Sequence, residues 1–248
     1  MNTNHTMQFT LAILSLAVLS AVGCKAPGKP GPAEERPEEV KDFNALYKQN
    51  CAACHGEQGR GGNAISMANP VYIAVAGQQP IAKAIAEGGP GDLMPAFGKK
   101  YGGFLTDEQV NILAYGIVQR WGNPRALGGA TAPAYAATLT GDVANGKAAF
   151  NSFCVRCHQD TANPNPKLRN VGPITDPDFL ALISDQNLRS TILTGKPDEG
   201  MPDWRGYAAQ PLSDQQVTDL VAWLASQRRT NGAKPASLPT STPQGEQK

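Results

Sequence analysis

The sequence predicts an all-α protein in which one small helical unit occurs twice in tandem. Two capping boxes, Thr106–Gln109 and Ser213–Gln216, each open a stretch in which apolar residues recur at helical spacing. Segments that alternate between polar and apolar residues are scarce, so we expect few strands. The two halves of the chain also carry the same motifs in the same order, which indicates an internal duplication.

In chain order, each unit is expected to begin with a short helix, at 43–50 and at 144–153, and to end with the helix that follows its capping box. The apolar positions that support the two final helices are Val110, Leu113, Ala114 and Ile117 in the first unit and Val217, Leu220, Val221 and Leu224 in the second.

The pentapeptide Cys-x-x-Cys-His occurs in both units, at Cys51–His55 and at Cys154–His158. Two thiols at this spacing can each add to one vinyl group of a haem, and the adjacent histidine then lies under the iron. The pattern predicts two covalent haem c groups. Their expected attachment points are Cys51, Cys54, Cys154 and Cys157, with His55 and His158 as proximal iron ligands. Units of roughly 80 residues bury little apolar surface, so each haem would complete a core.

Two other interpretations of the pentapeptides fit the sequence less well. A thioredoxin-like redox motif needs one Cys-x-x-Cys beside a βαβ unit. A zinc finger separates its histidine pair from its cysteines, whereas here each histidine directly follows a cysteine.

The second axial ligand of each iron is expected to be a methionine. Apart from His5, near the start of the chain, the only histidines are the two in the pentapeptides. Met94 and Met201 occupy matched positions, each followed by proline in a turn-rich segment, and we expect them as distal ligands. Met67 has no counterpart in the second unit, so we expect it to pack in the core.

The register of the duplication changes once along the chain. The pentapeptides are 103 positions apart, whereas Met94 and Met201, like the capping boxes, are 107 apart. Pro70 and Pro173 each follow their histidine by 15 residues. This pairing predicts a four-residue length difference between the proline and the methionine.

Both units resemble class I c-type cytochromes. The shared features are a first helix, Cys-x-x-Cys-His, a proline, a methionine loop and a last helix. The resemblance implies that the carbonyls of Pro70 and Pro173 accept hydrogen bonds from His55 and His158. In the second unit, Gly146-x-x-x-Phe150 and Leu220–Leu224 resemble the family's contact between the first and last helices.

The first unit departs from the family at that contact. Phe43 stands where Gly146 does, and Gly116 stands where Trp223 does. We expect a reciprocal exchange, in which one partner at the helix crossing is small so that the other can be large.

The N-terminal segment has the features of an export signal. Residues Phe9–Val22 form an apolar run too short to span a bilayer comfortably, and it ends at Cys24 in a sequence that resembles a bacterial lipobox. An ordinary cleaved signal or a short anchor is the alternative. The expected parts are a signal peptide (1–23), a Pro/Glu-rich tether (24–40), cytochrome c domains at 41–122 and 141–229, a linker (123–140) and a disordered tail (230–248).

The function implied by the resemblance is electron transfer through two His/Met haems on the periplasmic side of a bacterial membrane, with a lipid on Cys24. The expected partners are redox proteins, such as a quinol-oxidising complex and a terminal oxidase or photosynthetic reaction centre. A formal charge of +1 with no basic stripe argues against nucleic acid. The alternatives are a diheme enzyme (peroxidase or sulfur-compound dehydrogenase) with a displaceable methionine, and a redox or gas sensor.

Overall fold

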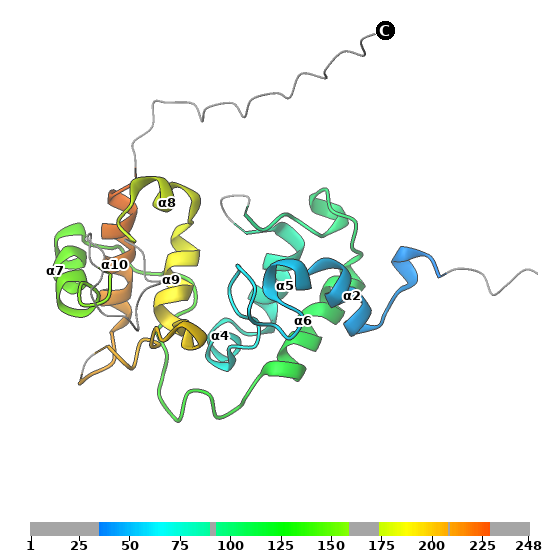
Figure 1. Cartoon of the computed structure of the whole chain (residues 1–248), viewed down its shortest axis with the longest axis horizontal. Helices are drawn as coiled ribbons and strands as arrows, with labels where there is room; N and C mark the ends of the chain where they lie inside the picture. The colour runs from blue at the N-terminus through cyan, green and yellow to red at the C-terminus, as the bar shows by residue number, and fades with distance from the viewer. Residues whose placement is uncertain (1–34, 90–92, 159–173, 208, 229–248) are drawn as a thin grey trace, which may run out of the picture. The chain divides into compact units, whose positions relative to one another are not determined.

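The computed structural model describes residues 35–89, 93–158, 174–207 and 209–228 of the 248-residue chain. The signal peptide, Cys24, Pro173 and the C-terminal tail lie outside these residues. A short segment before residue 40 forms a unit of its own, with one turn of 3-10 helix at Pro37–Glu39, and residues 40–248 form a second unit that holds both repeats. The described residues contain helices and no named strand, which confirms the all-α prediction (Figure 1).

Each repeat begins with a helix that leads directly into its pentapeptide. Helix α2 (Phe43–Asn50) is capped by Asp42, and α7 (Val143–Phe153) is capped by Asp142; in each, the carboxylate accepts a backbone N–H of the first turn. Their bounds agree with the sequence prediction to within one residue.

The last helix of each repeat begins at its capping box. In α6 (Asp107–Trp121), Thr106 accepts the N–H of Gln109, and the Gln109 side chain accepts the N–H of Thr106. The same reciprocal pair opens α10 (Asp214–Ser226) at Ser213. Both predicted boxes are confirmed.

Two middle helices, which the sequence analysis did not predict, repeat with a constant offset. Helices α5 (Gln78–Glu87) and α9 (Asp185–Thr194) begin and end 107 positions apart. Each ends at a glycine in the left-handed region, Gly88 (φ 83°) or Gly195 (φ 64°), where a side chain would be strained.

The short helices before them correct the predicted register. Helix α4 (Pro70–Ala76) begins with Asn69 as its cap, and α8 (Pro177–Leu182) begins with Asp176 as its cap. The structural counterpart of Pro70 is therefore Pro177, already 107 positions away. Thus the four-residue length difference lies between the histidine and this helix, and the predicted pairing of Pro70 with Pro173 was wrong. Both prolines fit the first helical position, where no N–H is needed.

The first and last helices of each repeat pack against each other, α2 on α6 and α7 on α10 (Figure 1). A Cβ added at Gly116 would lie 2.6 Å from Cε2 of Phe43, and one added at Gly146 would lie 2.6 Å from Cβ of Trp223. The glycine is on the last helix in the first repeat and on the first helix in the second. The predicted exchange is confirmed.

Each repeat has its own apolar core. The first is built from Leu46, Tyr47, Met67, Tyr72, Ile73, Ala76, Ile81, Ile85, Leu105, Val110, Leu113, Ala114 and Ile117. The second is built from Ala149, Phe150, Leu180, Leu188, Ile192, Leu193, Trp204, Leu212, Val217, Leu220, Val221, Trp223 and Leu224. Met67 belongs to the first, as expected.

Part of the segment 123–140, which the sequence analysis gave as a linker, packs against the two cores. Leu127, Ala130 and Ala132 contact the second core, and Tyr135 contacts the first. Alanine side chains bury apolar surface here because a neighbouring core offers a face for them. Arg189 of α9, almost fully buried, donates to the carbonyl of Ala134 from Nε at 3.0 Å and from a terminal nitrogen at 2.8 Å.

Candidate haem sites

The two pentapeptides adopt the same backbone turn. The carbonyl of Cys51 accepts the N–H groups of Cys54 (3.2 Å) and His55 (2.9 Å), and the carbonyl of Cys154 accepts those of Cys157 (3.0 Å) and His158 (2.9 Å). Cys51 (φ −119°, ψ −35°) and Cys154 (φ −112°, ψ −37°) end α2 and α7 in nearly the same conformation. Each pair of thiols and its histidine are therefore presented from one helical turn.

The ring of His55 is buried and held by the backbone. Its Nδ1 lies 2.8 Å from the carbonyl oxygen of Ile65. Because a carbonyl can only accept, Nδ1 must carry the hydrogen, and the lone pair of Nε2 is directed away from this bond for a metal. Burial lowers the pKa of His55, against a smaller opposite effect of the Ile65 bond, which favours the neutral ring that an iron ligand requires.

The acceptor for His55 is not the one that the family resemblance implied. The assignment to the carbonyl of Pro70 was wrong, because Pro70 lies in the first turn of α4 and the bond goes to Ile65, five residues earlier. Sequence reasoning missed Ile65 because a backbone carbonyl has no side-chain signature. The assignment of Pro173 to His158 lies outside the described residues.

The first thiol of each pentapeptide differs from the reactive thiol of a redox dithiol. Burial raises the pKa of Cys51 and of Cys154 to about 12, with a smaller contribution from the second cysteine of each pair. Reactive Cys-x-x-Cys motifs have a depressed pKa instead. None of the described cysteines forms a disulfide.

The four thiols and two histidines do not converge on one point. Among the residues that the structure describes, no three His, Cys, Asp or Glu side chains gather where they could share a metal ion. A structural zinc site needs four ligands around one ion. The donors are arranged instead as two separate sets, one per repeat, each with two thiols and one imidazole, which is the donor set of covalent haem.

The expected distal ligands lie at the edges of the two cores. Met94 is half-buried, packs against the first core, and its carbonyl accepts the N–H of Gly89 at 2.8 Å. Met201 is also half-buried and pairs with Lys196 in a two-residue bridge, through N–H···O bonds of 3.0 and 3.1 Å. These hydrogen bonds involve the backbones of Met94 and Met201, whereas Met67, only 7% exposed, is a core residue.

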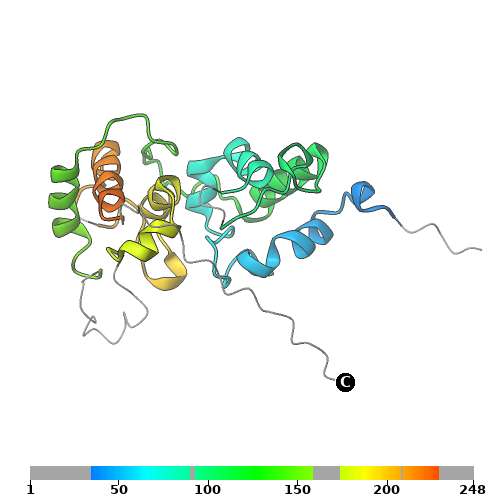
Figure 2. The same ribbon diagram turned by 90° about the horizontal axis from the view of Figure 1, so that it is seen from above.

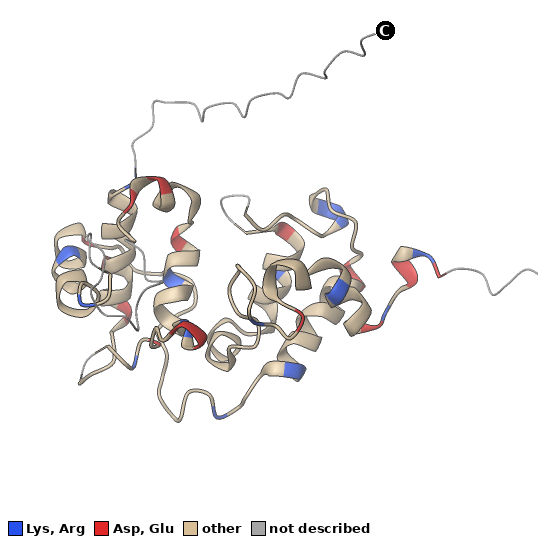
Figure 3. Cartoon of the chain, in the orientation of Figure 1, with Lys and Arg blue, Asp and Glu red and all other residues tan. Residues whose placement is uncertain are grey.

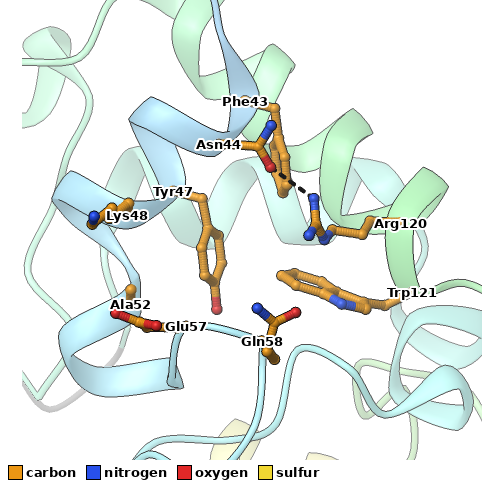
Figure 4. Close-up of a pocket in the computed structure, with 9 residues that line it drawn as sticks. All are labelled: Phe43, Asn44, Tyr47, Lys48, Ala52, Glu57, Gln58, Arg120 and Trp121. Carbon is orange, nitrogen blue, oxygen red and sulfur yellow. Dashed lines mark hydrogen bonds between the residues drawn. The ribbon is translucent and has the colours of Figure 1, made fainter.

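A pocket of about 180 Å³ opens beside the first pentapeptide, between α2 and α6 (Figure 4). Its floor is aromatic: the rings of Tyr47 and Trp121 are 5.1 Å apart, and Phe43 lies 5.7 and 6.1 Å from them. The hydroxyl of Tyr47 donates to the carbonyl of Gly56 at 3.0 Å. This bond ties the first helix to the residue that follows His55, so it supports the turn that carries the histidine.

Comparisons with known proteins agree with this geometry. Residues 143–228 match the family model of cytochrome c, and residues 38–115 match that of cytochrome c oxidase, cbb3-type, subunit III. The chain consists of two cytochrome c domains and is a diheme c-type cytochrome, with one covalently bound haem c in each domain.

Within this class, the chain is similar to the cbb3-type cytochrome c oxidase subunit CcoP of Azospirillum sp. (strain B510). The two are 32% identical over an alignment of 195 positions, which covers 73% of this chain and 59% of the relative. The chain thus spans less than two thirds of the curated relative's length. A solved structure, the reducing HAO-like protein complex of Kuenenia stuttgartiensis, aligns with 81% of this chain and 100% of that chain at 18% identity and a TM-score of 0.47.

Two further observations concern membrane-spanning helices and surface charge. Within the part of the chain that the structure describes, no helix is both long and apolar enough to cross a bilayer. Basic and acidic side chains are interspersed over both domains (Figure 3), in keeping with a formal net charge of +1.

Proposed function

We propose that the protein is an electron carrier in which both haems are held by one histidine and one methionine. The observation that supports this most directly is the repeated turn, in which two thiols and a histidine leave the end of α2 and of α7 in the same way. A duplicated attachment site fits a protein that passes single electrons between two equivalent centres. The likeness to a subunit of a cytochrome c oxidase supports the same function.

The residues of each domain have separate roles in this proposal. Cys51, Cys54, Cys154 and Cys157 would form the thioethers, His55 and His158 the proximal iron bonds, and Met94 and Met201 the distal ones. The haem supplies a centre that gains and loses one electron. The protein keeps each ligand in place through both redox states: Ile65 fixes the His55 ring, and the bridge to Lys196 fixes the Met201 backbone.

The partners would be redox proteins of a respiratory membrane complex. The relative is named as a subunit of a terminal oxidase. The proposed route runs from a quinol-oxidising complex to an oxidase or to a photosynthetic reaction centre. The proposed location is the periplasmic side of the membrane, with a lipid on Cys24 as the anchor.

Carbon monoxide tests the proposal on the reduced protein. A haem iron with two strong protein ligands should not bind it, so the visible spectrum of the reduced protein should be unchanged after addition of the gas. Binding at one or both haems would indicate an open or displaceable position, which an electron carrier does not need and a haem enzyme does. That result would favour the peroxidase or dehydrogenase alternative.

A further inference from the structure

Asn69 joins the two cytochrome domains through one side chain. It is only 3% exposed. Its Oδ1 accepts the N–H groups of Val71 (3.0 Å) and Tyr72 (3.4 Å), which caps helix α4 of the first domain. Its Nδ2 donates to the carbonyl of Thr194 in the second domain at 3.0 Å. The donors on one side and the acceptor on the other fix which end of the amide faces which domain.

The acceptor is the last residue of a helix in the other domain. The final carbonyls of an α-helix have no partner within the helix and need one from elsewhere. At the end of α9, the carbonyl of Leu193 accepts the N–H of Trp204 within its own domain at 3.2 Å. Thr194 is 1% exposed, and its carbonyl accepts a hydrogen bond from Asn69 of the first domain instead. A lost bond here would leave a buried carbonyl unpaired, which is costly.

The duplication shows which property of Asn69 matters. Its counterpart in the second domain is Asp176, which caps α8 by accepting the N–H groups of Asp178 (2.9 Å) and Phe179 (2.8 Å) in an exposed setting. Aspartate and asparagine cap helices about equally well. Only the amide can also donate to a carbonyl, and the amide is found at the position that faces the other domain.

Apolar contacts surround this hydrogen bond. Val71 and Val75 of α4 pack against the core of the second domain, and α4 and α9 lie side by side in both views (Figures 1 and 2). The rings of Tyr72 and Tyr135 meet edge to face at 6.4 Å. Since the carbonyl of Tyr135 accepts the side-chain N–H of Gln186 of α9 at 2.9 Å, the linker also binds both domains.

The contact includes the loop that carries the expected distal ligand of the second haem. A cavity of about 440 Å³ is lined by Asn69 and Val71 on one side and by Met201 and its neighbours Gly200 and Pro202 on the other. The hairpin of Met201 starts at Gly195, directly after the carbonyl that Asn69 binds.

We infer that Asn69 ties the first cytochrome domain to the end of helix α9, so that the two haem domains keep one fixed arrangement. The protein is then a rigid pair of haems rather than two domains that move on a tether. This goes beyond the proposed electron transfer. It can be tested in a protein that meets no partner, so its failure and that of the proposed function are distinguishable.

The test measures the distance between the two ferric haem irons by pulsed electron paramagnetic resonance in the full chain. Wild type should give one narrow distribution. Asn69→Asp and Asn69→Ser both keep the cap of α4 and lack the donor to Thr194, so both should broaden the distribution. Asp176→Asn, which changes the matching cap away from the contact, should leave it narrow. Two haems per chain by mass confirm that each variant has matured.

Hydrogen exchange gives a second readout of the same contact. Loss of the buried bond should speed exchange in the segment 195–206 by roughly 5- to 100-fold in the Asp and Ser variants and should not affect it in Asp176→Asn. A broad distribution in wild type would overturn the inference, as would wild-type width and exchange in both Asn69 variants. If only Asn69→Asp broadens the distribution, repulsion by the new carboxylate is the cause, and the claim that the amide donor holds the domains is wrong.

Discussion

Phe43 occupies the space that a side chain at Gly116 would need: a Cβ built there lies 2.6 Å from Cε2 of the ring. The second domain has the opposite arrangement, with Gly146 on the first helix and Trp223 on the last, where the Trp223 ring meets that of Phe150 at 4.4 Å. Both domains therefore keep one small and one large residue at the same crossing. Each crossing pairs one glycine with one aromatic residue, and the two residues exchange helices between the domains.

A double-mutant cycle tests this exchange. Gly116→Trp alone should overpack the crossing and lower the free energy of unfolding by about 1–3 kcal/mol. Phe43→Gly alone should leave a cavity and cost roughly 3–5 kcal/mol. The double variant recreates the arrangement of the second domain, so it should recover much of the loss, as measured by denaturant unfolding of the haem-loaded protein. Simple additivity would contradict the contact, because touching residues couple.

Replacing the expected distal ligands should change one haem at a time. Met94→Ala and Met201→Ala should each remove about half of the weak near-infrared band that arises from methionine bound to ferric iron, and should lower the potential of that haem. Met67→Ala is the control. Because Met67 is a core residue, it should cost roughly 2–5 kcal/mol of stability and keep the whole band. Loss of the band in the Met67 variant would mean that the ligand of the first haem is misassigned.

Pro70→Ala should leave the first haem unchanged. The bond that orients His55 goes to the carbonyl of Ile65, and Pro70 only begins helix α4, where alanine is also tolerated. Potentiometric titration should therefore give the wild-type potential, with a small loss of stability. A shifted potential of the first haem would show that Pro70 does act on His55.

Arg189 should be much more costly to remove than an exposed lysine such as Lys41. Its side chain is 1% exposed and bonds Asp214, Thr218 and the carbonyl of Ala134. Arg189→Met should lower the free energy of unfolding by about 3 kcal/mol. This is the low end for a broken buried ion pair, because Asp214 is 30% exposed. The variant should also be cleaved faster by protease within the linker, which loses its bond to Arg189. Lys41→Met is the control, since its pair with Glu108 is 60% exposed on both sides and contributes about 0–1 kcal/mol. Equal losses of stability and equal rates of linker cleavage in the two variants would contradict the conclusion that Arg189 holds the linker through the carbonyl of Ala134.

Membrane attachment should depend on Cys24. Acyl chains hold a protein at a bilayer, and the thiol of Cys24 is the one not needed for a haem. Cys24→Ser should therefore appear in the soluble periplasmic fraction with both haems intact. If it stays in the membrane, an uncleaved apolar segment or a partner complex holds it there, and mass analysis of the N-terminus distinguishes the two.

The sequence predicted those parts of the fold in which the type of a single residue determines the local structure, such as a helix cap or a glycine at a close helix contact. The reciprocal capping of Thr106 with Gln109 fixed the start of α6, and the glycines at 116 and 146 marked the two helix crossings. Helices α5 and α9 were not predicted, although Ile81 and Ile85 of the first and Leu188 and Ile192 of the second recur at helical spacing. Available signals were Ser184 as a cap of α9 and the glycines that end both helices.

Two predictions about Pro70 were wrong, each for its own reason. The role given to Pro70 depended on a side chain standing for its carbonyl, but any residue has a carbonyl, and the one that reaches His55 is that of Ile65. Counting residues from the histidine also paired Pro70 with Pro173, because the count cannot show where an insertion lies. The matched helix caps at Asn69 and Asp176 show that the insertion lies between the histidine and this helix.

Because the linker packs mainly on the second domain, the two halves of this duplicated protein differ in how much chain each needs to fold. Leu127, Ala130 and Ala132 cover the second core, and the buried guanidinium of Arg189 binds the linker carbonyl at Ala134. The second domain therefore starts, as a folding unit, well before the helix at which its repeat begins. A fragment cut at residue 141 would expose apolar surface and remove the Ala134 acceptor of the buried Arg189 guanidinium, so recombination or domain transplantation has to carry this linker along with the second half.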